Sequence, residues 1–295
     1  MTIEETTKRK VLVTGASGQQ GGAVLNTLLK RGHQVRALTR KPDSEWAASV
    51  ASRGVEVVAG DLTDQDSLVR AATGVDTIFL MTTPFEAGVD VETQQGLAML
   101  EAAKQANIGH LVFSSVASAD QATGIPHFES KFKVEEAIIA SGISHTIVAP
   151  VFFMDNITSP WYLPGILEGT LVMPMPADVR LQHIAVEDIG QFVVSIIERR
   201  ESVFGLRFDI ASDEKTGEEV AQILSEKIGR TIGYAGFSPD ALREENEDFA
   251  IMFDWFIETG YSVDTSALKA EFPDVSWVDL KAWLHSQTLE QNVSV

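Results

Sequence analysis

The stretch Val11-Leu12-Val13-Thr14-Gly15-Ala16-Ser17-Gly18-Gln19-Gln20-Gly21-Gly22 decides the fold of this chain. Its apolar start is typical of a buried strand, and the residues from Ala23 to Leu29 that follow it are typical of a helix. Glycines in such a turn let the backbone approach a pyrophosphate, and the new helix offers unpaired N–H groups to phosphates. The stretch therefore predicts the first turn of a dinucleotide-binding unit, whose contact residues are Gly15, Ser17, Gly18, Gln19, Gln20 and Gly21.

The composition is that of a soluble globular protein. The chain has 295 residues, of which 44% are hydrophobic and 22% are charged, enough for one large domain or two modest ones. No apolar run approaches the roughly 20 residues that span a bilayer, and the polar residues 1–10 lack the apolar core of a secretory signal. We therefore expect a cytoplasmic protein that does not associate with membranes.

The net charge argues against nucleic acid as a partner, and the residue types argue against disulfides and a metal site. The formal net charge of −19 repels the phosphate backbone, so we expect no direct nucleic-acid binding. The chain has no cysteine, which excludes disulfides and thiolate ligands. The histidines His33, His110, His145 and His285 lack the spacing of metal ligands, so we expect no metal site.

Apolar runs and helical segments alternate through the first half of the chain. This alternation predicts an α/β fold of the Rossmann type, a doubly wound parallel sheet with right-handed crossovers. Both faces of such a sheet are covered, which explains strands that are apolar throughout. The expected strands are Val11–Thr14, Gln34–Leu38, Val55–Val58, Thr77–Met81, His110–Ser114 and Ser144–Ala149.

The alternation loosens after Pro150, where a second part of the chain is expected to begin. Residues 8–150 are predicted to form the dinucleotide-binding Rossmann domain, with 183–210 packing back onto it. Residues 151–182 carry four prolines, a composition typical of a lid or subdomain. Together with 211–295 they are predicted to form a smaller C-terminal α/β domain for a substrate or partner.

The residues after the second strand favour NADP over NAD. NAD-preferring units carry an acid there, about 20 residues beyond the glycines, for the ribose hydroxyls. This chain has Arg40 and Lys41 instead, and a guanidinium suits a 2′-phosphate. The alternative is that both are surface cations after a strand.

Further cofactor contacts are expected where the next strands end. Asp61 and Leu62 follow the third strand, where they can contact adenine, although Asp61 also suits a plain turn. Thr63 is expected to cap the helix that follows. The fourth strand ends in Thr82, Thr83 and Pro84, which are predicted to lie near the ribose on the nicotinamide side.

Several motifs together resemble the NmrA-like proteins, an atypical branch of the short-chain dehydrogenase/reductase superfamily. They are the glycine turn, Gly60-Asp61-Leu62, Phe113-Ser114-Ser115 and Pro150-x-Phe152-Phe153-Met154-x-Asn156. The segment His127-Phe128-x-x-Lys131-x-x-Val134-Glu135-Glu136 is especially similar to an NADP-binding redox-sensor subgroup. The resemblance covers nearly the whole chain and implies an NADP(H)-binding core with a cleft beside a smaller domain. Pro150 is expected near the cofactor, and Phe152, Phe153 and Met154 either line an apolar pocket near the nicotinamide or form part of the core.

The catalytic motif of the superfamily is incomplete here. Most members reduce carbonyls with Tyr-x-x-x-Lys, and this spacing reads His127 to Lys131 in this chain. Lys131 can still hold the ribose hydroxyls. His127 could act as a general acid, or it could be a structural histidine at a helix start. Ser114 and Ser115 either face the nicotinamide or only complete a strand.

Two functions stay open for a complete nucleotide site without the tyrosine. The first, narrowly favoured, is a redox sensor or regulator that changes conformation with the cofactor and acts on a protein partner. The second is an NADPH-dependent reductase of quinones, dyes or other conjugated apolar acceptors, which can take their proton from water. A structural domain without nucleotide binding is a third possibility, and a homodimer through Thr93–Ala106 or Lys131–Ser141 is possible.

The acidic clusters are interpreted as solvated surface. Asp213-Glu214 and the run Glu244-Glu245-x-Glu247-Asp248 are expected on solvated helix faces, with a partner surface as the alternative. His183 is expected to pack rather than to react.

Overall fold

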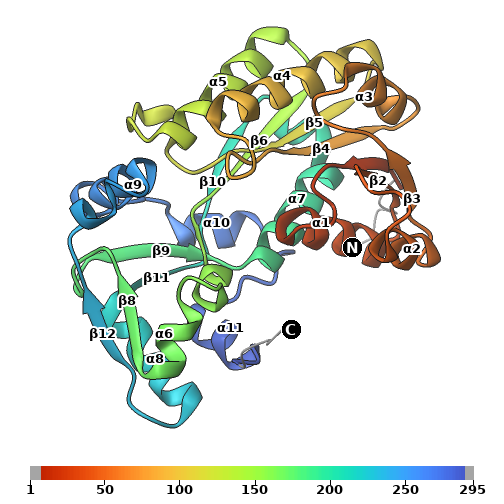
Figure 1. The fold of residues 1–295 in the computed structure, drawn as a ribbon. Helices are drawn as coiled ribbons and strands as arrows, with labels where there is room; N and C mark the ends of the chain where they lie inside the picture. The colour runs from red at the N-terminus through yellow and green to blue at the C-terminus, as the bar shows by residue number, and fades with distance from the viewer. Residues whose placement is uncertain (1–7, 290–295) are drawn as a thin grey trace.

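The computed structural model describes residues 8–289, and they form one large and two small sheets (Figure 1). The large sheet has seven strands, all parallel, in the order β10-β6-β5-β4-β1-β2-β3. This order confirms the predicted doubly wound α/β fold of the Rossmann type. The strands are β1 (Lys10–Val13), β2 (Gln34–Thr39), β3 (Glu56–Ala59), β4 (Thr77–Met81), β5 (His110–Ser114), β6 (His145–Pro150) and β10 (Arg207–Ile210).

Helices cover both faces of the large sheet, and alternate residues of each strand enter different cores. In β1, Val11 and Val13 pack on one face against α1, α2 and α7, while Leu12 packs on the other against α3, α4 and α5 (Figure 1). All three side chains are buried, which is why the strand is apolar throughout. The helices are α1 (Gln19–Lys30), α2 (Glu45–Ser52), α3 (Gln65–Ala72), α4 (Val89–Gln105), α5 (Pro126–Ser141) and α7 (Val186–Arg199).

The later residues form a smaller lobe with a core of its own. Its sheets are β11-β9-β7, in which β9 pairs antiparallel with β11, and β12-β8. The core contains Met154, Leu171, Phe253 and Trp283. Its elements are β7 (Phe152–Phe153), α6 (Leu163–Glu168), β8 (Thr170–Met173), β9 (Arg180–Ile184), β11 (Asp213–Thr216), α8 (Gly217–Ile228), β12 (Gly233–Gly236), α9 (Glu247–Glu258) and α11 (Leu280–Ser286). Between α9 and α11, α10 (Thr265–Glu271) places Leu268 in the core on the α1 and α7 side of the large sheet instead.

Two local predictions were wrong. Asp64, not Thr63, caps α3, because Asp61 accepts hydrogen bonds from the backbone N–H and hydroxyl of Thr63 and delays the helix start by one residue. Asp213 does not lie on a solvated helix face: it begins strand β11, where its carboxylate accepts from the backbone of Leu280. Within residues 8–289, no helix combines the length and apolar character needed to cross a membrane.

Candidate functional site at the carboxyl edge of the large sheet

The ends of β1 and β4 are joined by one threonine at the point where the strand order reverses. Thr14 donates its hydroxyl to the carbonyl of Met81 at 3.0 Å and accepts from the Met81 N–H at 2.8 Å. In doubly wound sheets ligands bind in the crevice at this switch point, beyond the carboxyl ends of the strands. The glycine turn therefore lies in the position that a dinucleotide site requires.

The glycine turn keeps the start of α1 open. Gly15 has a φ of +61°, a backbone conformation that favours glycine, and Gly18 is the N-cap of α1 without a capping side chain. The first turn of α1 carries no acid, and Ser17, Gly18 and Gln19 are exposed. Free N–H groups at an uncapped helix start attract anions through their hydrogen bonds and the helix dipole.

We predict that Gly21→Ala lowers the thermal stability of the protein. A Cβ at Gly21 would collide with the backbone carbonyls of Gly15 and Thr14, so α1 would have to move away from β1. Such overpacking costs about 1–3 kcal/mol of unfolding free energy. Gly22→Ala is the matched control, because its Cβ would lie at an ordinary 3.5 Å from the carbonyl of Ala16. Thermal unfolding of both variants checks this, and equal stability would contradict it.

Gln20 and Ser114 contact each other beneath the turn. Both are buried, and the Ser114 hydroxyl donates to Gln20 Oε1 at 2.6 Å. This bond fixes α1 against the end of β5. The Ser115 hydroxyl is also engaged, by the buried carboxylate of Glu135, which Arg207 pairs at 2.9 Å. Burial raises the pKa of Glu135, against the opposing effect of Arg207.

A pocket of about 280 Å³ lies beyond β2 and β3, on the side where the adenosine half of a dinucleotide is expected. Arg40, Asp61 and Arg70 are among its lining residues. The hydrogen bonds from Thr63 to Asp61 lower the pKa of that carboxyl group, so Asp61 both shapes a turn and lines the pocket. Arg70 was missed, because a basic residue in the last turn of a helix has no distinguishing pattern.

Arg40 is paired across this region with Glu86. Its guanidinium nitrogens lie 2.9 and 3.2 Å from the two carboxylate oxygens of Glu86, and both side chains are largely exposed. The neighbouring Phe85 is 71% exposed, and its ring centroid lies 5.8 Å from that of Phe249 on α9. The loop between β4 and α4 thus contacts Phe249 of the smaller lobe through Phe85, and Arg40 beyond the end of β2 through the next residue, Glu86.

Thr83 and Pro84 shape this loop, which we name the β4–α4 loop, Thr82–Gly88. The hydroxyl of Thr83 accepts from the N–H of Phe85 at 3.4 Å, and the carbonyl of Pro84 accepts from the N–H of Gly88 at 2.7 Å. Lys41, at the end of β2, is exposed.

Lys131 is held at the end of β4 by a buried carboxylate. Its Nζ donates to the carbonyl of Thr82 at 3.1 Å and to Glu92 Oε1 at 2.8 Å. Glu92 is fully buried and also accepts from the hydroxyls of Thr82 at 3.0 Å and Ser130 at 2.5 Å. The predicted residues Lys131 and Thr82 are therefore in contact. Glu92 was missed, because an acid in the first turn of a helix is usually solvated.

His127 lies one turn before Lys131 on α5 and is held by the smaller lobe. Asp248 accepts from the His127 backbone N–H at 3.2 Å and contacts its ring Nδ1. The sequence predicts Asp248 on a solvated helix face, with a partner surface as the alternative. Its contact with His127 joins residues 121 positions apart, and no local pattern in the sequence indicates it.

The remaining predicted contacts are partly or wholly packed. Pro150 is buried at the end of β6, where its carbonyl accepts from Ala117 at 3.0 Å. Phe153 and Leu62 are half-buried, each against a core of the large sheet. Burial of His183 beside Phe152 lowers its pKa to about 4.

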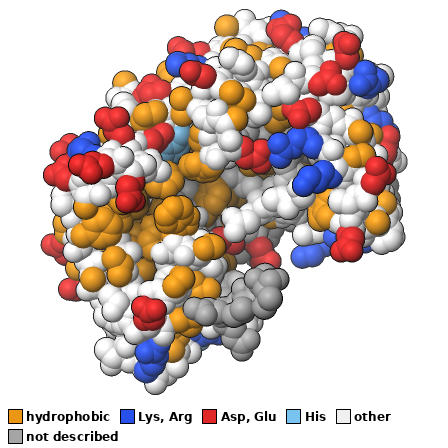
Figure 2. Space-filling view, viewed as in Figure 1, with side chains coloured by type: hydrophobic (Ala, Val, Ile, Leu, Met, Phe, Trp, Pro, Cys, Tyr) orange, Lys and Arg blue, Asp and Glu red, His pale blue; other side chains and the backbone are white. Residues whose placement is uncertain are grey.

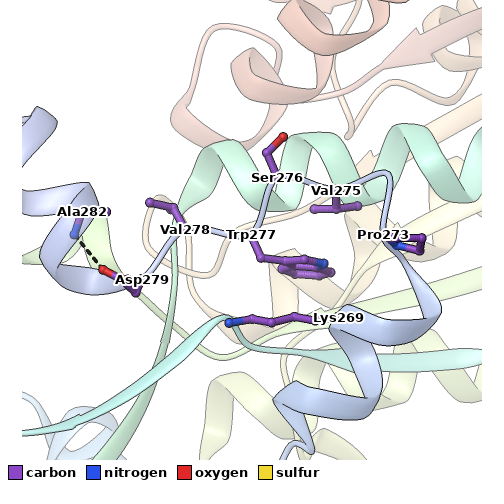
Figure 3. A pocket seen from close by; sticks show the side chains of 8 residues that line it. All are labelled: Lys269, Pro273, Val275, Ser276, Trp277, Val278, Asp279 and Ala282. Atoms are coloured by element: carbon purple, nitrogen blue, oxygen red, sulfur yellow. Dashed lines mark hydrogen bonds between the residues drawn. The ribbon is translucent and has the colours of Figure 1, made fainter.

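A larger hollow, of about 550 Å³, lies away from this edge, along the segment between α10 and α11 (Figure 3). Figure 3 shows the Lys269 side chain extended alongside the Trp277 ring. Beneath the segment, Asp188 accepts from the Val278 N–H at 3.0 Å, and burial raises the pKa of Asp188 to about 7. None of the residues predicted from the sequence lines this hollow. Among residues 8–289, no three His, Asp or Glu side chains are grouped to hold a metal ion.

Comparison with known proteins identifies relatives over nearly the whole chain. The sequence model of the NmrA-like family matches residues 7–284. An NAD(P)H azoreductase of Xenophilus azovorans is 30% identical, over 79% of this chain and 79% of that protein.

Solved structures show the same fold. Triphenylmethane reductase of Citrobacter sp., complexed with NADP(H), superposes with a TM-score of 0.80 at 23% identity, covering 93% of this chain and 98% of that one. The negative transcriptional regulator NmrA, solved with NADP, superposes with a TM-score of 0.79 at 20% identity and 95% coverage of both chains. The family match spans all but a few of the residues that form the fold and the site, so this chain belongs to the NmrA-like family.

Proposed function

We propose that this protein binds NADP(H) at the carboxyl edge of the large sheet. Supporting this are the glycine turn, in which Gly15 has a φ of +61° and Gly21 lets α1 lie close to the end of β1, and the uncapped start of α1. In this proposal the helix start receives the pyrophosphate, while Arg40 and Arg70 face the 2′-phosphate. Lys131 holds the ribose hydroxyls at the nicotinamide end through its ammonium donors.

We further propose that the protein is a reductase of conjugated apolar acceptors. The bound dinucleotide would supply a hydride. The observation that carries this function is Lys131, which the buried Glu92 and the carbonyl of Thr82 fix at the end of β4. Figure 2 shows, in addition, hydrophobic side chains gathered around a hollow on one face of the molecule. Phe85 and Phe249 are two aromatic residues on this side of α5. Aromatic side chains stack on planar conjugated molecules, and the related azoreductase is named for such an acceptor.

The reductase function is tested by following NADPH oxidation against quinones, azo dyes and enones. We expect turnover above background with at least one of these acceptors, and its loss in Lys131→Ala. Tight NADPH binding without oxidation by any of them would reject the reductase.

A redox sensor is the second candidate, and the β4–α4 loop favours it. The loop contacts Arg40 through Glu86 and the smaller lobe through Phe85, so a ligand that displaced Glu86 could change the contacts of α9. A sensor requires different affinities of two conformations for two ligands. Hydrogen exchange of residues 82–88 and 247–258, compared between NADP⁺, NADPH and NAD⁺, tests this. Identical exchange with all three would reject it.

We predict that Glu86→Gln increases NADP affinity a few-fold. Glu86 neutralises Arg40 in the structure, and a 2′-phosphate would have to compete with its carboxylate. Exposed ion pairs of this kind contribute about 0.2–1 kcal/mol. Asp90→Asn, in the first turn of α4, is the control for a general loss of negative charge. Calorimetric titration checks the prediction, and reduced NADP affinity in Glu86→Gln would contradict it.

A further inference from the structure

The imidazole of His127 is oriented from the smaller lobe. One carboxylate oxygen of Asp248 contacts Nδ1, and the other accepts from the His127 backbone N–H at 3.2 Å. Ring nitrogen Nε2 makes no hydrogen bond to any residue between 8 and 289. A carboxylate at Nδ1 selects the tautomer with the proton on Nδ1 when the ring is neutral. Nε2 is therefore the nitrogen that can exchange a proton with a bound molecule.

The surroundings of His127 are aromatic. The ring centroids of Phe85, Phe128 and Phe249 lie 6.1, 4.9 and 6.3 Å from the imidazole centroid, and the His127 side chain is only 9% exposed. An ion pair with little water around it is stronger than one at the surface. The Asp248 carboxylate is therefore placed to form an ion pair with His127 when the ring is protonated.

The position on α5 relates His127 to the proposed cofactor site. His127 precedes Lys131 by four residues, a spacing that places both side chains on one side of a helix. Lys131 reaches the end of β4 through the carbonyl of Thr82. The oriented imidazole thus lies on the same side of α5 as the residue that we propose to hold the ribose.

We infer that Asp248 is a positioning residue that makes His127 the proton donor for acceptors whose oxygen gains negative charge on reduction. This inference rests on the proposed reductase function. As a quinone or enone takes up hydride at carbon, the Nε2–H bond of the His127 imidazolium breaks and an O–H bond forms. The neutral imidazole keeps its Nδ1 proton on Asp248, and water returns a proton to Nε2. The smaller lobe thereby contributes Asp248, the carboxylate that orients His127, and His127 takes the place of the missing tyrosine as proton donor.

The inference predicts a difference between two classes of acceptor. A quinone or enone becomes an oxyanion and needs a proton, whereas a cationic triarylmethane dye becomes neutral on taking up hydride and needs none. General acids contribute about 10²–10⁴-fold to rate. We therefore expect Asp248→Asn and His127→Phe each to reduce kcat for the quinone or enone at least tenfold. Both variants should leave kcat for the dye within about twofold.

The control variant is Glu247→Gln, a neighbouring exposed acid in the same turn of α9, which should leave both rates unchanged. A readout without activity is the ¹⁵N NMR spectrum of His127 in the cofactor-free protein. At a pH at which the ring is neutral, we expect the tautomer protonated on Nδ1 in the native protein and its loss in Asp248→Ala. NADPH affinity and thermal unfolding of each variant show whether its fold is retained.

Two results would overturn the inference while leaving the reductase function intact. The first is turnover in the native protein that Asp248→Asn leaves unchanged or reduces equally for quinone and dye. The second is an Nε2-protonated neutral tautomer of His127 in the native protein. NADPH binding without turnover of any acceptor is the distinct result that rejects the reductase itself, and the donor role with it.

Discussion

Replacing Lys131 by alanine is expected to weaken NADPH binding by about 1.5–3 kcal/mol, the range for losing hydrogen bonds to a charged group. The ammonium of Lys131 lies at the end of β4, held by Thr82 and by the buried Glu92. In the proposed complex it also donates to the ribose hydroxyls. Fluorescence titration of NADPH into the native protein and the variant measures the loss.

The single variant also removes the only cation that contacts Glu92 among residues 8–289. An unpaired buried carboxylate costs stability, so weaker binding could follow from a disturbed fold. The double variant Lys131→Ala/Glu92→Gln separates the two causes, because a neutral amide has no charge to compensate. We expect the double variant to recover thermal stability but not NADPH affinity. A stable Lys131→Ala protein with native affinity would contradict the role of Lys131.

Replacing Arg40 by alanine is expected to abolish the proposed preference for NADP over NAD. Arg40 lines the pocket beyond β2 and β3, and it is already paired through two nitrogens with a carboxylate, Glu86. The loss of hydrogen bonds to a charged group costs about 1.5–3 kcal/mol, which is more than a tenfold loss of NADP affinity. NAD has no 2′-phosphate, so its affinity should not fall.

Two further variants sharpen the Arg40 experiment. Arg40→Lys keeps the charge but not the planar fork, so we expect an intermediate NADP affinity. Arg53→Ala, which removes an exposed arginine that contacts Asn26 at 2.7 Å, should change neither affinity. An equal loss of NADP and NAD affinity in Arg40→Ala would show that Arg40 supports the fold rather than the 2′-phosphate.

The strands of the large sheet could be predicted from the sequence because burial on both faces leaves a continuous apolar run. The expected strands Thr77–Met81 and His110–Ser114 coincide with β4 and β5. The smaller lobe could not be predicted as well. Strand β11 reads Asp-Glu-Lys-Thr, and it is a strand because it pairs with β9, not because of its own residues.

Some residues of the candidate site could likewise be predicted from the sequence, whereas their partners could not. The glycine turn and Arg40 are found from short local patterns in the chain, and Lys131 is found from the superfamily motif that the chain resembles. Their partners come from distant segments: Glu86 is 46 residues from Arg40, and Glu92 is 39 residues from Lys131. Only the fold brings these acids to the edge of the sheet, so no local pattern distinguishes them from solvated acids.

Titration of NADPH and of NADH into the native protein tests the central claim most directly, because it depends on no substrate. The arrangement of the glycine turn, Arg40 and Lys131 predicts that both nucleotides bind, with a Kd for NADPH at least about tenfold below that for NADH. Equal affinities for the two nucleotides would contradict the role of Arg40. The absence of binding by either would contradict the assignment of the carboxyl edge as a dinucleotide site.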